Sequence, residues 1–147
     1  MNRPWAALGL VLALCVIMPR EASAQKSSAP GRPGMTQNYP NPLNPKTTQP
    51  FTVGGFPTCA EPGRQYRITL KVLNVLGQTV SFPVLVGGTG GVSGGAPLKG
   101  VLLPCGSYQA LWDEKNFGTG REPASGVYIF VLDQDGVLIS SKAIVSK

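Results

Sequence analysis

Apolar and polar residues alternate along several short stretches of this chain, and the alternation is clearest in Tyr66–Leu73. There, apolar side chains stand at every second position, with mostly basic or hydroxyl side chains between them. A period of two is typical of a half-buried β-strand. Two further apolar stretches, Val127–Leu132 and Val137–Val145, flank a short polar link that ends in Asp135-Gly136. Because such a link is a strong hairpin signal, we predict that the sequence ends in a β-hairpin.

The two arms of this hairpin differ in pattern. Val127–Leu132 is apolar at every position, so we expect a central strand that is covered on both faces. The second arm turns polar at Ser140-Ser141-Lys142 and is followed by the terminal Lys147. This pattern predicts an accessible edge strand, and an edge is where another protein can add or read a strand.

Weaker β-prone stretches complete the pattern. Thr47–Phe56 suits an edge strand or a bulged strand, because Pro50 removes a donor from the ladder. Thr79–Val86 follows a turn, and Ser107–Trp112 places Trp112 on one face with two other apolar side chains, as a core anchor. After the first 24 residues, no segment of ten or more residues has helical periodicity. About seven short strands separated by turn signals predict an all-β antiparallel sandwich.

The first 24 residues have the pattern of a signal peptide. Arg3 supplies a positive start, an apolar run follows, and Ala22-Ser23-Ala24 has the small-x-small form of a cleavage site. The apolar run is too short to cross a bilayer comfortably, so a retained anchor is the weaker alternative. We therefore expect an exported protein whose mature chain starts near Gln25 and has no transmembrane segment.

Segments rich in proline and glycine connect the expected elements. Residues 25–37 are rich in Ser, Pro and Gly and predict a flexible tether. The three prolines of Gln37–Pro45 predict a rigid extended strap, which we expect Tyr39 and Leu43 to pin to the sandwich. Gly87–Gly100 contains seven glycines in fourteen positions, and this composition predicts a mobile insertion loop.

The cysteines point to a disulfide. Cys15 lies in the expected leader, which leaves Cys59 and Cys105 in the mature chain. In an exported protein such a pair predicts a structural bridge, worth about 4 kcal/mol for a loop of this length. Two cysteines in a chain without His cannot fill a typical zinc shell.

The charge is moderately basic. Removing the leader takes 13 basic and 7 acidic residues to 11 and 6, so the formal net charge goes from +6 to +5. The basic residues are scattered and not interleaved with aromatic residues on one element, so we expect no binding to nucleic acid. A weak attraction to anionic envelope polymers is the most that this charge supports.

The sequence offers little chemistry for catalysis or metal binding. No nucleophile with a nearby base can be assembled, so we expect neither enzymatic activity nor a cofactor. Asp133 and Asp135 lie two residues apart in a turn composition. Asp113, Glu114 and Asn116 do not match the spacing of a calcium loop. No Gly-Lys-Ser/Thr follows the glycine-rich segment, which argues against a phosphate-binding loop.

A carbohydrate-binding module stays open as an alternative, because Tyr108, Trp112 and Tyr128 are aromatic side chains that can stack on sugars. Their alternation along the two expected strands favours a place in the core instead.

Four blocks stand in order along the chain and together resemble a known family. The blocks are Asn38–Thr48, Leu73–Gln78, Gly106–Tyr108 with Trp112-Asp113, and Ala124–Tyr128. They resemble the type A C-terminal sorting domain of the type IX secretion system, and the same pattern is similar to the Ig-like domain of the flagellar hook-capping protein. The resemblance covers one domain, Asn38–Lys147.

This resemblance implies an Ig-like sandwich at the C-terminus of an exported bacterial protein. It further implies that an outer-membrane translocon recognises the last hairpin and that the protein is delivered to the cell surface or the medium. The positions that match the family's signal are Gly77, Gly126, Tyr128, Lys142 and Lys147.

Two other interpretations stay open for these residues and for the domain. The two glycines can simply serve turns, the tyrosine can pack in the core, and the two lysines can keep an edge strand soluble. The domain can also be an envelope structural or interaction module that docks on a partner protein and carries no secretion signal. The chain departs from the family in Gln49-Pro50 of the first strand, in the glycine-rich insertion and in the cysteine pair.

Overall fold

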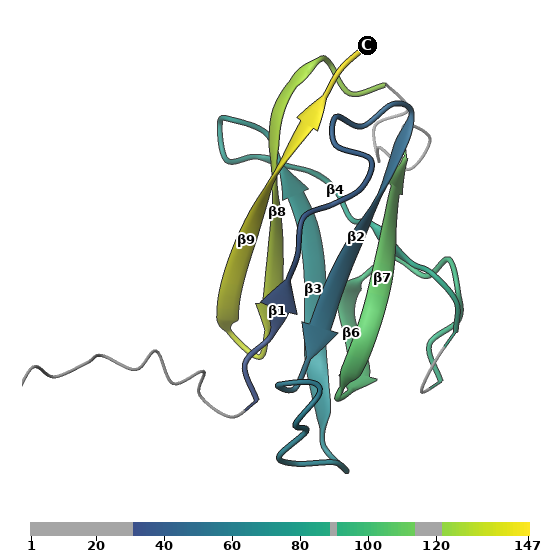
Figure 1. Ribbon diagram of the computed structural model, residues 1–147, viewed down its shortest axis with the longest axis vertical. Coiled ribbons are helices and arrows are strands. Elements are labelled where there is room, and N and C mark those ends of the chain that lie inside the picture. The colour runs from purple at the N-terminus through teal and green to yellow at the C-terminus, as the bar shows by residue number, and fades with distance from the viewer. Residues whose placement is uncertain (1–30, 89–90, 114–121) are drawn as a thin grey trace, which may run out of the picture.

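Two antiparallel sheets pack face to face in this protein (Figure 1). The structure is a computed structural model that describes residues 31–88, 91–113 and 122–147. It confirms the predicted all-β sandwich, with nine strands in the described residues instead of about seven. The strands are β1 (Gly34–Met35), β2 (Lys46–Val53), β3 (Gln65–Leu73), β4 (Thr79–Ser81), β5 (Val84–Leu85), β6 (Lys99–Pro104), β7 (Gly106–Asp113), β8 (Gly126–Gln134) and β9 (Val137–Val145).

The expected signal peptide and the first part of the expected tether lie outside the described residues. Within the described ranges, no helix has the length and apolar character needed to span a membrane.

The smaller sheet has the strand order β1-β2-β7-β5. In β2 every second side chain is buried, which fits its period-two pattern. Pro50 suggested an edge strand, but β2 has a neighbour on each side. β7 pairs with it over its whole length, and the two-residue β1 pairs with its other side. The carbonyl oxygen of Pro50 accepts a hydrogen bond of 3.4 Å from the Thr36 N–H, so the backbone of Pro50 faces the β1 side. Because β1 is short, the N–H that proline lacks removes little pairing on this side.

The larger sheet has the order β4-β3-β8-β9, and β6 also pairs with β3. The predicted closing hairpin is confirmed, with β8 and β9 paired from Gly126↔Val145 to Gln134↔Val137. Asp135 and Gly136 form its turn with φ of 49° and 88°, the left-handed geometry that a two-residue hairpin favours. The Asp133 carboxylate accepts a hydrogen bond of 2.8 Å from the Gly136 N–H, which closes the turn.

Trp112 lies at the centre of the core between the sheets. It is fully buried, and its ring meets the rings of Tyr128 and Phe130 edge to face, with centroids 5.3 and 5.6 Å away. The hydroxyls of Tyr108 and Tyr128 each donate to a carbonyl four residues upstream, at 2.7 and 3.0 Å. A tyrosine tied back in this way is typical of Ig-like sandwiches.

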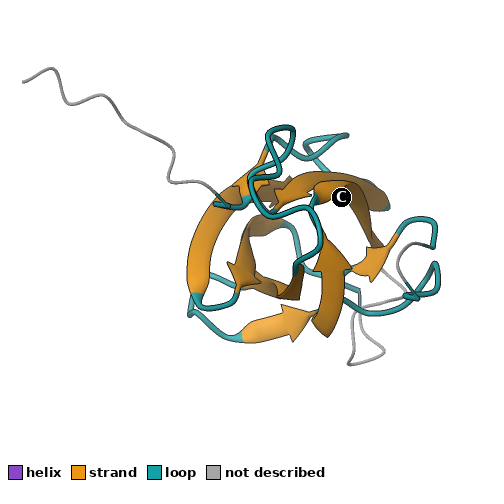
Figure 2. Ribbon diagram, turned by 90° about the horizontal axis from the view of Figure 1, so that it is seen from below, coloured by secondary structure: helices purple, strands orange, loops and turns teal. Residues whose placement is uncertain are grey.

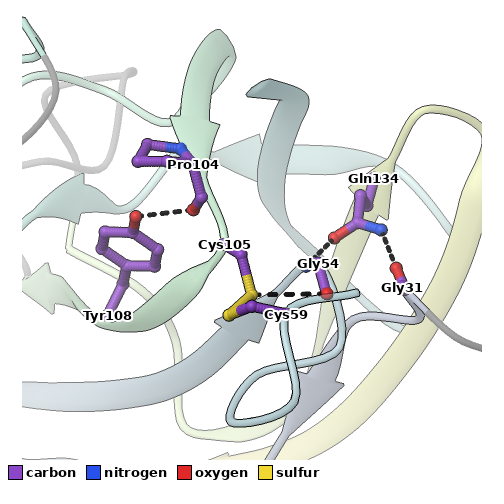
Figure 3. The surroundings of a disulfide bond; sticks show 7 residues. All are labelled: Gly31, Gly54, Cys59, Pro104, Cys105, Tyr108 and Gln134. Carbon is purple, nitrogen blue, oxygen red and sulfur yellow. Dashed lines mark hydrogen bonds between the residues drawn. A yellow bond between two sulfur atoms is a disulfide. The ribbon is translucent and has the colours of Figure 1, made fainter. Parts of the chain in front are cut away.

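Five of the links between consecutive described strands connect one sheet to the other, and the predicted disulfide joins two of these links. The link from β2 to β3 contains Cys59, and the step from β6 to β7 occurs at Cys105. Their sulfur atoms form the bridge with a Cα–Cα distance of 5.7 Å. Beside it, the buried Gln134 side chain accepts from the Gly54 N–H at 2.8 Å and donates to the Gly31 carbonyl at 2.5 Å (Figure 3). This end of the sandwich is therefore held covalently and by hydrogen bonds.

Two segments differ from what their sequences predicted. The described part of the expected tether includes β1, so the folded unit begins before Asn38. The expected strand Thr79–Val86 is two strands, β4 and β5, because the chain changes sheet at Phe82-Pro83.

In the glycine-rich insertion, the part that the structure describes is tied to the sandwich and does not form a free loop. Leu98 is fully buried, and its N–H and carbonyl bond to Pro83 and Leu70 at 2.9 and 2.8 Å. Seen from below, the strands of the two sheets form a nearly closed ring (Figure 2).

Candidate functional site

The last strand, β9, is the outer strand of the larger sheet, as the sequence pattern predicted. Its side chains alternate: Ala143 and Val145 are buried, whereas Leu138 and Ile144 are exposed. The backbone groups that do not pair with β8 belong to the even-numbered residues and point away from the sheet. The edge of β9 is therefore the first place to look for recognition of the hairpin.

The strap Gln37–Pro45 covers the C-terminal half of this edge. The Leu43 N–H donates to the Ile144 carbonyl at 2.7 Å, and the Ser146 N–H donates to the Leu43 carbonyl at 3.3 Å. The Asn41 side chain accepts from the Ile144 N–H at 3.0 Å, and the Gln37 side chain donates to the Lys142 carbonyl at 3.2 Å. The expectation of an accessible edge is therefore wrong for this half of β9, where the strap takes up the outward backbone groups.

Buried polar contacts hold the strap in place. Asn38 is buried, and its amide donates to the Thr47 hydroxyl at 2.9 Å. That hydroxyl donates in turn to the Pro40 carbonyl at 2.9 Å. Leu43 is buried as expected, whereas Tyr39 is half exposed and is fixed through its backbone to Thr48. The anchors of the strap are thus Leu43 and Asn38, and the role of Asn38 was missed because a polar residue in a proline-rich segment resembles a solvated one.

The residues matched to the sorting signal lie in different environments. Gly77, Gly126 and Lys147 lie at the end of the sandwich that is uppermost in Figure 1. Tyr128 is in the core against Trp112, which gives it a structural role. Lys142 is exposed on the outer face of the larger sheet. The fold therefore brings three of the five to one end and places one of the others on the adjoining face.

Local contacts account for some of these residues. Gly77 has φ +76°, which its turn requires. The ammonium group of Lys147 lies 2.6 Å from the Glu122 carboxylate, and the Lys147 N–H donates to the Ser125 hydroxyl at 3.2 Å. The end of the chain is thereby tied to the start of β8.

The turn between β3 and β4 presents two apolar side chains to solvent. Val75 and Leu76 are 74% and 78% exposed. The Asn74 carboxamide oxygen accepts from the N–H groups of Leu76 and Gln78, both at 3.0 Å. Gly77 indicated the turn in the sequence. The exposure of Val75 and Leu76 could not be predicted in this way, because it depends on which elements pack near the turn in the folded domain.

The outer face of the larger sheet is partly apolar, which corrects the expectation that β8 is covered on both faces. β8 is central, between β3 and β9, but only its even-numbered side chains face the core. Val127 is 41% exposed and lies opposite Ile144, which is 37% exposed. Half-buried Ile129 lies between Leu73 and Lys142 of the neighbouring strands.

The opposite end of the molecule holds a groove of about 500 Å³ near the disulfide. Arg64 in its wall lies 2.7 Å from Glu61 and 3.6 Å from Asp135, and its guanidinium stacks on Tyr66. The hydrogen bond and the charge of Glu61 raise the pKa of Arg64. The charges of Arg64, Glu61 and Asp135 therefore pair with one another in the wall of the groove.

Other chemistries have little support among the described residues. No group of three or more Cys, Asp or Glu side chains is placed to hold a metal ion in the parts of the chain that are described. The carbohydrate alternative loses its aromatic platform, because Trp112 and Tyr128 are buried and Tyr108 is half-buried. Of the three residues considered for calcium, Glu114 and Asn116 lie outside the described residues.

Comparison of the chain with protein-family models, with curated proteins and with solved structures found no match to any of them.

Proposed function

We propose that this chain is an exported, non-enzymatic protein whose Ig-like domain is recognised through its last hairpin by the outer-membrane translocon of a type IX secretion system. The route ends at the cell surface or in the medium. The resemblance of four ordered sequence blocks to sorting domains motivates this proposal. The observation that carries it is the position of β9, an outer strand that exposes Lys142 on its outer face and is followed by Lys147 at the end of the sandwich where Gly77 and Gly126 lie.

The address in this proposal is conformational. Gly77 belongs to the turn after β3, while Gly126 and Lys147 belong to the closing hairpin, and they share one end of the molecule because β3 pairs with β8. A receptor that reads all three requires the folded domain. An unfolded chain would present only the last residues.

Charge reversal tests the proposal more cleanly than truncation. Deleting residues 142–147 would remove buried Ala143 and Val145 and the partner of Leu43, and would unfold the domain. The double variant Lys142→Glu/Lys147→Glu keeps the packing of β9. We expect it to accumulate in the periplasm of a bacterium that carries the type IX system.

Lys46→Glu is the matched control, because Lys46 is exposed on the other sheet. The control should be exported like the wild type. If the double variant folds and is exported at the rate of the control, the last hairpin is not the address.

A second candidate function is an envelope interaction module without a secretion signal. The partly apolar outer face of the larger sheet favours it, since exposed apolar rows on a sheet are typical of contact surfaces. The two candidates differ in their dependence on the translocon. A chain that stays in the periplasm of both translocon-positive and translocon-deficient cells, bound to an envelope protein, would favour the module.

A further inference from the structure

The turn Asn74–Gln78 and the outer face of the larger sheet form one continuous surface. Leu73, the last residue of β3, lies opposite Ile129, and the turn follows it directly. Val127 and Ile144 form the next pair toward the same end. An apolar stretch therefore runs from the sheet face to the tip of the turn.

Hydrogen bonds within the turn hold the tip of this surface in one conformation. Besides the two hydrogen bonds that its carboxamide oxygen accepts, the Asn74 backbone N–H donates to the Gln78 carbonyl and the Asn74 carbonyl accepts from the Gly77 N–H, both at 3.0 Å. Its amide also donates to the Gln78 side chain at 2.9 Å. Val75 and Leu76 are thus exposed on a fixed backbone and not on a loose loop. A preorganised side chain loses little backbone entropy when a partner takes it up, which favours binding.

Lysines flank the apolar stretch. Lys71 lies opposite Val131, and Lys142 lies opposite Ile129. Arg67 and Lys99 lie farther along the same face, on β3 and β6. Asp133 of the neighbouring β8 also lies on this part of the face. None of these four cations joins an ion pair within the described residues, where the ion pairs belong to Arg64 and Lys147.

We propose that this surface docks on an acidic protein surface that has an apolar pocket for Leu76. The proposal rests on the proposed function and deepens it, because it assigns the surface by which the partner holds the domain. The apolar centre with charged groups around it matches the organisation of protein interfaces. The cations favour a partner with carboxylates at the rim, which would steer association and fix its orientation.

A protein fits this surface better than an anionic bilayer does. On a sheet face, lysine side chains extend farther than Val and Ile, so lipid headgroups would meet the ammonium groups while Val127 and Ile129 stayed uncovered. A protein surface can place carboxylates beside the lysines and apolar groups over the lower row. The strap also directs binding to this face, because it occupies the adjoining half of the β9 edge.

Photocrosslinking in cells of the source organism tests the proposal. A benzophenone amino acid replaces Leu76 in one version of the full chain and Ile129 in another, and it replaces Ser107 in a control. Ser107 is exposed on the outer face of the smaller sheet. We expect protein adducts from positions 76 and 129 and none from position 107. Mass spectrometry of the adducts identifies the partner and the acidic peptide that is joined.

A charge-reversed background tests the specificity of these adducts. Lys71→Glu/Lys142→Glu should lower the adduct yield at position 76 by about tenfold, whereas Lys46→Glu should leave it unchanged. Circular dichroism of the purified variants verifies folding. Equal yields at positions 76 and 107, or yields that do not respond to the double charge reversal, would overturn the proposal.

Two further results would also overturn it. Adducts to lipid, together with co-sedimentation of the purified chain with phosphatidylglycerol vesicles, would assign the surface to a membrane. Adducts to a second copy of this chain would assign it to self-association.

The failures of the two proposals are distinguishable. If adducts at position 76 persist but export does not depend on the translocon, the sorting function fails and the docking surface stands. If export depends on the translocon but position 76 gives no adduct, the docking surface fails alone.

Discussion

Leu43 and Ile144, which are far apart in the sequence, are joined by a backbone hydrogen bond of 2.7 Å from the Leu43 N–H to the Ile144 carbonyl. This contact makes the proline-rich strap a partner of the last strand. An outer strand with free backbone groups invites uncontrolled pairing with other chains. The strap limits that pairing over half of β9 and leaves the outward side chains exposed for recognition.

Replacing Leu43 with Ala should release the strap. The buried side chain is lost, so we expect the free energy of unfolding to fall by about 2–5 kcal/mol. Amide hydrogen exchange should accelerate at Ile144 and Ser146 before the rest of β9. Asn44→Ala is the control, because Asn44 is exposed in the same segment. Unchanged exchange at Ile144 in a destabilised Leu43→Ala protein would contradict the role of the strap.

Asn38 should contribute through its buried hydrogen bond. Asn38→Leu removes the donor to the Thr47 hydroxyl, and we expect a loss of about 1–3 kcal/mol, measured by urea unfolding. If the loss reflects the unmade bond, the double variant Asn38→Leu/Thr47→Val should recover part of it. A double variant whose loss equals the sum of the two single losses would show that these side chains act independently.

The disulfide should stabilise mainly by restricting the unfolded chain. Its sequence separation of 46 corresponds to about 4 kcal/mol on the chain-entropy relation. Cys59→Ser/Cys105→Ser should therefore lower the urea midpoint strongly and abolish the effect of added reductant. If reductant does not shift the midpoint of the wild type, the bridge does not support the fold in solution.

Tyr108 should make stability fall at alkaline pH. Burial raises the pKa of Tyr108 above the ordinary value of 10.0. The unfolded state therefore loses this proton first, so the stability present below pH 10 is lost as the pH rises toward and through the folded pKa. Tyr108→Phe should show a shallower fall in unfolding free energy above about pH 10. Identical slopes for the two proteins would contradict this assignment.

Short-range patterns were sufficient to predict the sandwich. The period of two in β3 and the Asp-Gly turn of the hairpin depend on neighbouring residues, and both are present. The disulfide followed from the even pair of cysteines in a chain that its first residues predict to be exported. The pairing of the strap with β9 depends on residues far apart in the chain, and no local pattern carries that information.

The candidate surface was only partly predictable for the same reason. Lys142 and Gly77 were found through family resemblance, but the tip residues Val75 and Leu76 look like ordinary core residues in the sequence. Likewise, an all-apolar strand predicts cover on both faces, whereas β8 has one half-exposed face. Whether an apolar side chain is covered depends on which elements pack on it, and the sequence of the strand itself does not contain that information.

Labelling of intact cells tests the central claim most directly. A membrane-impermeant biotin reagent that reacts with lysine is applied to cells that express the chain, with and without a functional type IX translocon. We predict that the chain is labelled at the surface, or recovered in the medium, only when the translocon functions, and that it stays in the periplasm otherwise. Equal surface delivery in both strains, or retention in the periplasm of both, would contradict the claim that this domain is a sorting signal for that route.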